Sequence, residues 1–439
     1  MTSFWCENAI VGGLPRSSVR VEETRGMIDR VELDAAPRDR DERLMGLVLP
    51  GLANAHSHAF HRALRGRTHG GGGTFWSWRE LMYRVADRLD PENYLELATA
   101  VFAEMALAGV TVVGEFHYLH RRPGGEPYER GTAMEDAVLA AAARVGIRIT
   151  LLDALYLHGG LSEAGETLPL SPTQRRFSDG SLEAWASRRA ELRGGQLARI
   201  GAAIHSVRAV DPGILPAFRE LTDGVPVHAH VSEQSAENAQ ALAAWGRTPT
   251  ELLAEAGLLG PRFTAVHGTH LSDRDIGLLG DSRSTVCFCP TTERDLADGI
   301  GPASALFAAG ARLSLGSDQH AVIDPFEELR GLEMDDRLAT GERGRFSPAE
   351  LLDAASAAGY ESLGWEGGHL AVGALCDLVA VATDSPRTAG AALDELWLAS
   401  TSADVTTVVI GGRVIVANGR HHLGSVGELL GSAVERIGV

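Results

Sequence analysis

A chain of 439 residues with 44% hydrophobic and 22% charged residues is long enough for one large domain and a small satellite. Its formal net charge of −18 argues against nucleic acid as a partner, while a small anionic substrate would need a few local arginines. The sequence lacks an apolar run of about eighteen residues, so we expect no membrane span. The first residues also lack a secretion signal, and the expected location is the cytoplasm.

Two residue types narrow the chemistry. The four cysteines are predicted to be buried thiols of a reducing compartment. All 40 basic residues other than histidine are arginine. The absence of lysine excludes a lysine Schiff base, a Walker lysine and a lysine carbamate that bridges two metal ions.

From residue 46 to about residue 330, short apolar runs alternate with helical patterns. The eight predicted strands cover 47–56, 110–116, 147–155, 199–207, 225–231, 263–268, 284–290 and 312–318. This alternation predicts an α/β fold, a closed (β/α)8 barrel of the TIM type. An open doubly wound sheet is the alternative, but the first strand lacks the Gly-rich phosphate turn of such folds.

The two ends of the chain differ from this pattern. Residues 1–48 and 369–439 are rich in strand candidates around GG and NG turns. We expect them to pair into one small β-sandwich domain, which leaves 49–368 for the barrel. Residues 66–74 and 160–180 are predicted loops that serve either as mobile lids or as slack.

Polar residues gather where the predicted barrel strands end, which is where active sites of such barrels lie. Nine of the 16 histidines fall in these short stretches, so separate structural causes for all of them are improbable. The set comprises His56, His58, Glu115, His117, His205, Arg208, His228, His230, Glu233, His267, His270, Asp318 and His320.

A metal site is the simplest common purpose for these residues. His56 and His58 point the same way in an extended segment, because side chains alternate along a strand. With a histidine of the fifth strand and Asp318 they suit zinc with one position open for water; iron or manganese fits less well. We favour His230, which lies nearer the strand end, over His228, which is expected to be structural.

These motifs resemble the amidohydrolase superfamily: HSH, HVSE, VHGTH and LGSDQH stand at the ends of the first, fifth, sixth and eighth predicted strands. Longer stretches are similar to the formimidoylglutamate deiminases within it. They are HSHAFHRA, FWSWRELMYR, GEFHYLH, IHSVRAV, HVSEQ and GSDQHAVIDPFEELR, and they run across the whole barrel.

The resemblance implies one Zn²⁺ per chain, held by His56, His58, His230 and Asp318; a second ion on Glu115 is not expected. It implies hydrolysis of N-formimidoyl-L-glutamate to N-formyl-L-glutamate and ammonia in histidine degradation. A metal-activated hydroxide would attack the formimidoyl carbon. A homodimer is expected, since relatives are often dimers.

Each catalytic role has a candidate. Asp318 can accept a proton from the activated water, and Glu233 can protonate the imine nitrogen and the departing amine. A helix N-terminal carboxylate is the structural alternative for Glu233. His267 would stabilise the attacking hydroxide or the tetrahedral intermediate. His270 and His320 are expected to orient the ligands.

The substrate carboxylates call for arginine, whose planar fork binds a carboxylate at two points. A surface or helix salt bridge is the alternative for each candidate arginine. His61 stands where some members of the family have glutamine, and Gln319 where a small residue was expected. The implied substrate contacts are His61, Arg79, Tyr118, His205 and Arg208.

Two other functions remain open. An aminohydrolase acting on a guanine-, pterin- or triazine-like heterocycle would use the same zinc chemistry. It would need an apolar or aromatic pocket for the substrate to stack in, rather than two arginines. A zinc-binding barrel without catalysis is the other alternative, and the presence of Glu233 and Asp318 beside the ligands argues against it.

Overall fold

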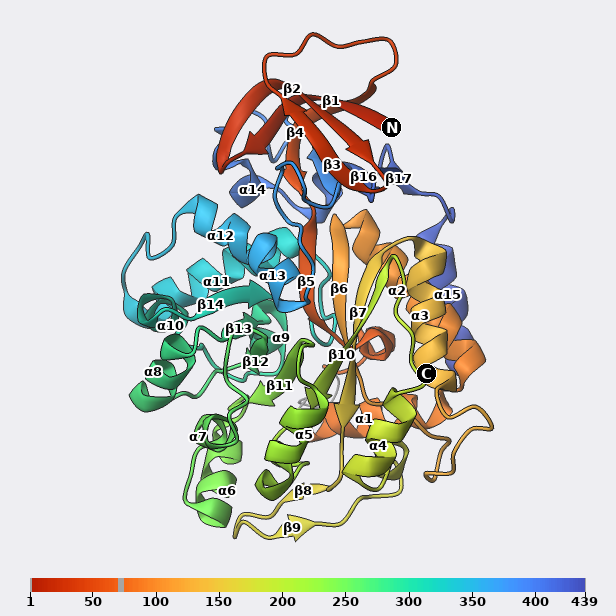
Figure 1. The fold of residues 1–439 in the computed structure, drawn as a ribbon, viewed down its shortest axis with the longest axis vertical. Helices are drawn as coiled ribbons and strands as arrows, with labels where there is room; N and C mark the ends of the chain where they lie inside the picture. The colour runs from red at the N-terminus through yellow and green to blue at the C-terminus, as the bar shows by residue number, and fades with distance from the viewer. Residues whose placement is uncertain (1, 70–74, 439) are drawn as a thin grey trace.

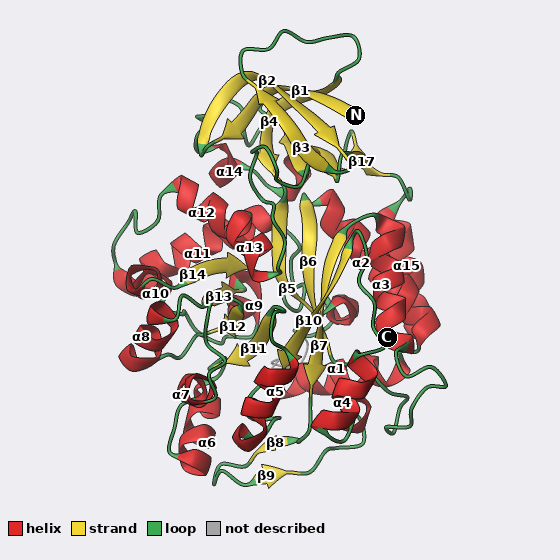
Figure 2. Cartoon of the chain, viewed as in Figure 1, coloured by secondary structure: helices red, strands yellow, loops and turns green. Residues whose placement is uncertain are grey.

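The computed structural model describes residues 2–69 and 75–438, which form a barrel with a β-sheet above it (Figures 1 and 2). The barrel strands run in the order β14-β13-β12-β11-β10-β7-β6-β5, each parallel to the next. They are β5 (Leu52–Ser57), β6 (Val110–His117), β7 (Arg148–Leu155), β10 (Ala198–Ile204), β11 (Val227–Val231), β12 (Phe263–His267), β13 (Thr285–Phe288) and β14 (Arg312–Leu315). The predicted (β/α)8 barrel is confirmed.

The ring of strands closes between β5 and the segment that follows β14. A parallel bridge pairs Ser57 with Asp318 there. The Asp318 backbone N–H donates to the His56 carbonyl at 3.0 Å, and the His58 N–H donates to the Asp318 carbonyl at 3.1 Å. Hydrogen bonds at this seam therefore join two of the three segments whose side chains were predicted to bind a metal.

Helices cover the outside of the barrel, with some strands buried on both faces. β6 and β7 are buried at every residue, and most of their residues are apolar. Helix starts follow ordinary capping rules: Asp90 accepts from the backbone N–H groups of Glu92 and Asn93 at 2.9 Å, and Pro91 follows it. The helices are α1 (Phe75–Arg88), α2 (Pro91–Leu107), α3 (Ala133–Val145), α4 (Leu182–Arg189), α5 (Leu215–Leu221), α6 (Ser235–Trp245), α7 (Pro249–Glu255), α8 (Asp273–Asp281), α9 (Pro290–Asp295), α10 (Ala303–Ala309), α11 (Pro325–Thr340), α12 (Pro348–Ala355), α13 (Ala357–Ser362), α14 (Leu396–Ala399) and α15 (Val426–Ile437).

The second sheet is built from both ends of the chain, as predicted. Where the sequence predicted a sandwich, hydrogen bonds link its eight strands into one sheet in the order β18-β17-β16-β15-β4-β1-β2-β3. Antiparallel pairing of β4 with β15 joins the two ends of the chain. The strands are β1 (Thr2–Val11), β2 (Leu14–Thr24), β3 (Met27–Glu32), β4 (Glu42–Pro50), β15 (Leu378–Val381), β16 (Val405–Ile410), β17 (Arg413–Ala417) and β18 (Arg420–His421).

Two segments cross the border between these units. The predicted strand 47–56 is divided, because β4 belongs to the end sheet and β5 to the barrel. Residues 426–437, which the sequence places in the small domain, form α15 and pack on barrel helix α2 (Figure 1). Arg436 of α15 forms an ion pair with Glu96 of α2 at 2.9 Å. Among the described residues, no helix is long and apolar enough to cross a membrane.

A buried ion pair connects the end sheet to the barrel. The Arg148 guanidinium of β7 donates to both carboxylate oxygens of Asp377, at 2.7 and 3.0 Å. Tyr360 and the Gly411 backbone N–H also donate to this carboxylate. Both charged side chains are at most 3% exposed, so the loss of either charge leaves the other buried without compensation.

Replacement of Asp377 by asparagine should lower the free energy of unfolding by about 3–5 kcal/mol, because the Arg148 charge stays buried without its partner. Urea unfolding followed by circular dichroism measures this change. Asp39→Asn, at an exposed position, is the matched control and should have almost no effect. Equal stability of the two variants would show that the ion pair does not hold the units together.

Candidate active site

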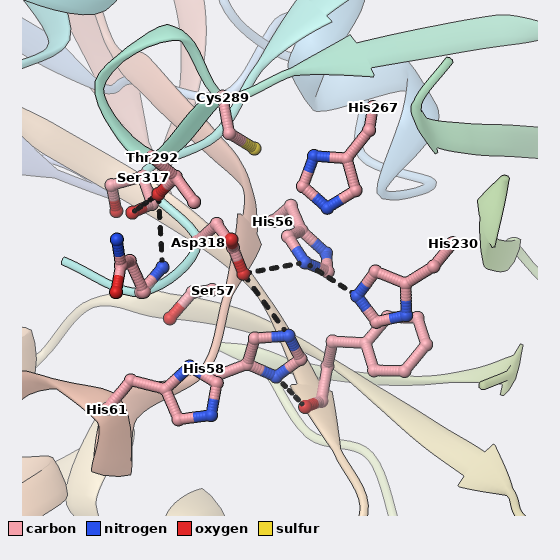
Figure 3. Close-up of polar contacts among 12 residues, drawn as sticks. His56, Ser57, His58, His61, His230, His267, Cys289, Thr292, Ser317 and Asp318 are labelled. Atoms are coloured by element: carbon pink, nitrogen blue, oxygen red, sulfur yellow. Dashed lines mark hydrogen bonds and ion pairs between the residues drawn. The ribbon is translucent and has the colours of Figure 1, made fainter. Parts of the chain in front are cut away.

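Four predicted ligands meet at the seam of the barrel. Figure 3 shows the side chains of His56, His58, His230 and Asp318 pointing toward one another. Asp318 Oδ1 lies 3.2 Å from His56 Nε2 and 3.3 Å from His58 Nε2, and the Nε2 atoms of His56 and His230 are 3.2 Å apart. Donor atoms about 2.0–2.1 Å from a tetrahedral Zn²⁺ lie roughly 3.3–3.4 Å from each other. These three distances match donors around a single ion of that size, while the set of donors within 4.8 Å of one another that contains His58 is completed by His61 and Asp318.

Backbone carbonyl groups orient two of these rings. His58 Nδ1 donates to the Phe116 carbonyl and His230 Nδ1 to the His205 carbonyl, both at 2.8 Å. With the ring hydrogen at Nδ1, each Nε2 offers its lone pair to the centre. Burial and the neighbouring imidazoles hold the pKa of His56 and His58 well below the ordinary value, and that of His230 falls to about 3. The rings are therefore neutral, which is the form that binds a metal.

The backbone at the site is strained. Asp318 has φ +40° and His267 has φ +70°, a region that residues other than glycine rarely adopt. Each such residue costs on the order of 1–3 kcal/mol, and the surrounding hydrogen bonds must hold it in place. At Asp318 the backbone bonds of the seam do so.

His320 lies behind the ligands, as expected. Its Nε2 is 3.1 Å from the Ser57 hydroxyl and its Nδ1 is 2.9 Å from the Ser317 hydroxyl, so it contacts residues adjacent to three ligands. His270 differs, because its Nε2 donates to the Asp298 carbonyl at 2.8 Å, outside the cluster of ligands. His228 is buried and bonds the Ser362 carbonyl at 3.0 Å, which fits its predicted structural role.

Glu115 is engaged in hydrogen bonds rather than directed to a second ion. Its carboxylate accepts from the Ser57 hydroxyl at 2.6 Å and from the Ala59 backbone N–H at 2.7 Å. Burial raises the pKa of this carboxyl to about 8.

His267 and Glu233 stand beside the four ligands. His267 Nε2 lies 4.0 Å from Glu233 Oε1, and its Nδ1 lies 3.3 Å from Glu293 Oε1. Burial alone would lower the pKa of His267, but the Glu293 hydrogen bond and the charges of Glu233 and Asp318 raise it to about 10. His267 also lies close enough to His56, His230 and Asp318 to share a metal site with them.

Arg208 stands between two carboxylates rather than at the surface. Its Nη2 is 3.4 Å from Glu233 Oε2, and its Nε is 3.5 Å from Glu237 Oε1. Burial would raise the pKa of Glu233, but the charges of His267 and Arg208 lower it. Glu233 is therefore anionic at neutral pH and sits next to the ligand cluster.

A cavity of about 420 Å³ opens above the cluster. Residues of the predicted loop 160–180 contribute to its wall, whereas residues 70–74 of the predicted loop 66–74 lie outside the described residues. Within the cavity His61 Nε2 is 2.9 Å from the Tyr118 hydroxyl. The predicted site residues that line it are His58, His61, Arg79, Tyr118, His205, Arg208, His230, Glu233, His267 and Asp318.

Several groups at this site belong to no motif that would have marked them in the sequence. Glu293 is one of them. It lies in the first turn of α9, and its carboxylate contacts Nδ1 of His267. Tyr83 of α1 and Tyr156 after β7 also line the cavity. Gln319, where a small residue was expected, turns its amide to Asp295 at 2.7 Å.

A second buried polar cluster lies away from the cavity. His117 and His120 face Glu135, with His120 Nδ1 2.6 Å from its Oε1. Arg188 donates to the same oxygen at 2.8 Å and to Asp153 at 2.9 Å, so a cation already neutralises these carboxylates. We interpret this cluster as a structural ion-pair network.

Residues 47–415 match the model of the amidohydrolase family. The chain belongs to this family. It is 38% identical to formimidoylglutamate deiminase of Pseudomonas aeruginosa over 96% of both chains. It is 33% identical to 8-oxoguanine deaminase of the same organism, over 85% of this chain and 83% of the relative. An amidohydrolase from Brucella melitensis has a TM-score of 0.90, with 30% identity and full coverage of both chains. This amidohydrolase is thus a hydrolase of the deaminase type, acting on C–N bonds.

Replacement of His58 by glutamine should abolish tight metal binding, because one of the four converging donors is lost. Elemental analysis after dialysis should find about one zinc per chain in the unaltered protein and almost none in the variant. His228→Gln is the matched control, since His228 is equally buried but outside the cluster. A full metal content in His58→Gln would remove His58 from the ligand set.

Proposed function

We propose that this amidohydrolase hydrolyses N-formimidoyl-L-glutamate to N-formyl-L-glutamate and ammonia, with one Zn²⁺ held by His56, His58, His230 and Asp318. The observation that carries the proposal is that the cluster of the four predicted ligands adjoins a cavity lined by two arginines. The 38% identity to a formimidoylglutamate deiminase supports the same substrate. Degradation of histidine is the context in which we place the reaction.

The donor set fits zinc. Three imidazoles and one carboxylate whose donor atoms lie 3.2–3.3 Å apart are groups that zinc binds, and a water would be a further ligand of the ion. When bound, the ion would supply an activated water nucleophile at neutral pH. Asp318, whose Oδ1 faces both His56 and His58, is placed to accept the proton released by that water.

The other side chains divide the remaining work. Glu233 faces the cavity next to the cluster. Because it is anionic, it can take the proton released by the water, directly or from Asp318, and pass it to the imine nitrogen, and it can then pass the second proton of the attacking water to the departing amine. His267 is held by Glu293 at Nδ1, so its Nε2 can donate to negative charge that develops in the transition state. Arg79 and Arg208 supply positive charge for the two carboxylates of the glutamate portion.

A second candidate is a deaminase acting on a guanine-like heterocycle. The similarity to 8-oxoguanine deaminase and the aromatic residues of the cavity favour it. The two arginines argue for an acidic substrate instead, because a guanidinium binds a carboxylate more strongly than a neutral heterocycle. A cytoplasmic homodimer belongs to the same proposal, and the four buried free cysteines are typical of a reducing compartment.

Ammonia release from a small panel tests the substrate. The zinc-loaded protein should turn over formimidoylglutamate with kcat/KM at least about 10⁴ M⁻¹s⁻¹. Formimidoylaspartate should react more slowly, and guanine and 8-oxoguanine should not react. Turnover of a heterocycle without turnover of the acidic imine would replace this function by the second candidate.

Replacement of Glu233 by glutamine should lower kcat for formimidoylglutamate by about 10²–10⁴-fold, since the proton carrier is lost. Zinc content should stay at the level of the unaltered protein, because Glu233 is not among the four donors. Glu220→Gln, on the exposed face of α5, is the control for the change of charge. Near-normal turnover by Glu233→Gln would exclude this residue from proton transfer.

A further inference from the structure

Three tyrosines line the cavity around one buried phenylalanine. The ring centroid of Phe177 lies 5.0 Å from that of Tyr118, 5.5 Å from Tyr156 and 6.0 Å from Tyr83. Phe177 is the last residue of the short 3-10 helix η2 (Gln174–Phe177), within the predicted loop 160–180. Phe177 also lines the cavity, so the end of this helix forms part of the wall that the tyrosines pack against.

Gln174, at the start of η2, has an amide group whose orientation is fixed by the backbone. Its Oε1 accepts from the Ser171 N–H at 3.0 Å, and its Nε2 donates to the Gly159 carbonyl at 3.0 Å. A backbone N–H can only donate and a carbonyl can only accept, so the amide cannot be flipped. The third contact, Nε2 to the Tyr156 hydroxyl at 2.8 Å, must then be a bond that Gln174 donates.

The Tyr156 hydroxyl consequently keeps its own hydrogen for another group. Among the described residues, Gln174 is the only hydrogen-bond partner of this oxygen. The same logic applies to Tyr83, whose hydroxyl accepts from Arg79 Nε at 2.8 Å, because a guanidinium never accepts. Burial raises the pKa of both phenols, so both remain protonated. Two residues that line the cavity therefore carry a hydroxyl group that can donate.

These two donors lie within the field of both cavity arginines. The positive charges of Arg79 and Arg208 both act to lower the pKa of the Tyr83 and Tyr156 hydroxyls. The Arg79 guanidinium lies 5.1 Å from the Tyr83 ring centroid. The wall thus combines positive charge with hydroxyl donors. A carboxylate, which only accepts hydrogen bonds, fits such a wall. An amide or ring N–H of a ligand would face other donors there and could not form a hydrogen bond with them.

We propose that Gln174 is a positioning residue that makes Tyr156 a hydrogen-bond donor, and that Tyr156 and Tyr83 join Arg79 and Arg208 in a subsite for a substrate carboxylate remote from the reacting carbon. The inference rests on the proposed function and deepens it, since it names the groups that select an acidic substrate. Gln174 does not line the cavity and acts only through Tyr156.

Two variants test this arrangement. Tyr156→Phe keeps the ring and removes the donor. Gln174→Glu replaces the amide by a carboxylate that accepts from Tyr156, which turns the hydroxyl hydrogen away from the cavity. Each change should raise KM for formimidoylglutamate about tenfold or more, as expected for a lost hydrogen bond to a charged group, and should leave kcat within about threefold.

The double variant separates positioning from general structural damage. In the Tyr156→Phe background, Gln174→Glu should raise KM no further, because the hydroxyl through which it acts is gone. N-methylformamidine, which has the reacting group but no carboxylate, should show the same kcat/KM in all variants. Gln196→Glu, an exposed position, is the control for the added charge.

Zinc content and thermal melts confirm that each variant is folded. If Gln174→Glu does not fold, Gln174→Met takes its place, with a smaller rise in KM that also vanishes in the phenylalanine background. An unchanged KM in Tyr156→Phe, or an undiminished effect of Gln174 in the double variant, overturns the inference. Failure of the unaltered protein to act on formimidoylglutamate would instead overturn the proposed function, and this inference with it.

Discussion

The barrel of this amidohydrolase closes at the same place where its candidate metal ligands meet. The backbone of Asp318 bonds that of His56 and His58, and its side chain faces both rings within 3.3 Å. One set of contacts therefore closes the sheet and sets the distance between three donors. The left-handed backbone of Asp318 is tolerated because these bonds hold it there.

Much of this arrangement could be predicted from sequence because it depends on short-range periodicity. Alternation along β5 places His56 and His58 on one face, and the repeat of eight strands places His230 and Asp318 at the same end of the barrel. The pairing of the chain ends followed from turn signals. The fold and the convergence of the four donors need no information beyond these patterns.

Side-chain contacts between loops that are distant in the sequence could not be predicted from such patterns. Glu293 reaches His267 from α9, which follows the next strand of the barrel, and Gln174 reaches Tyr156 from the loop after β7. Neither residue lies at a sequence spacing from other site residues that would identify it as functional. Arg208 stood out at a strand end, but its two carboxylate neighbours come from the next loop and helix. Side-chain partners of this kind are set by tertiary packing, which leaves no local period in the sequence.

X-ray absorption spectroscopy of the purified, active protein at the zinc edge tests the central claim most directly. Coordination by His56, His58, His230 and Asp318 predicts a first shell of nitrogen and oxygen at about 2.0–2.1 Å without sulfur. A sulfur neighbour at about 2.3 Å would instead place the ion at the adjoining group of His267, Cys289 and Glu293 and contradict the account. Full activity in protein that shows no zinc, iron or manganese edge would contradict it as well.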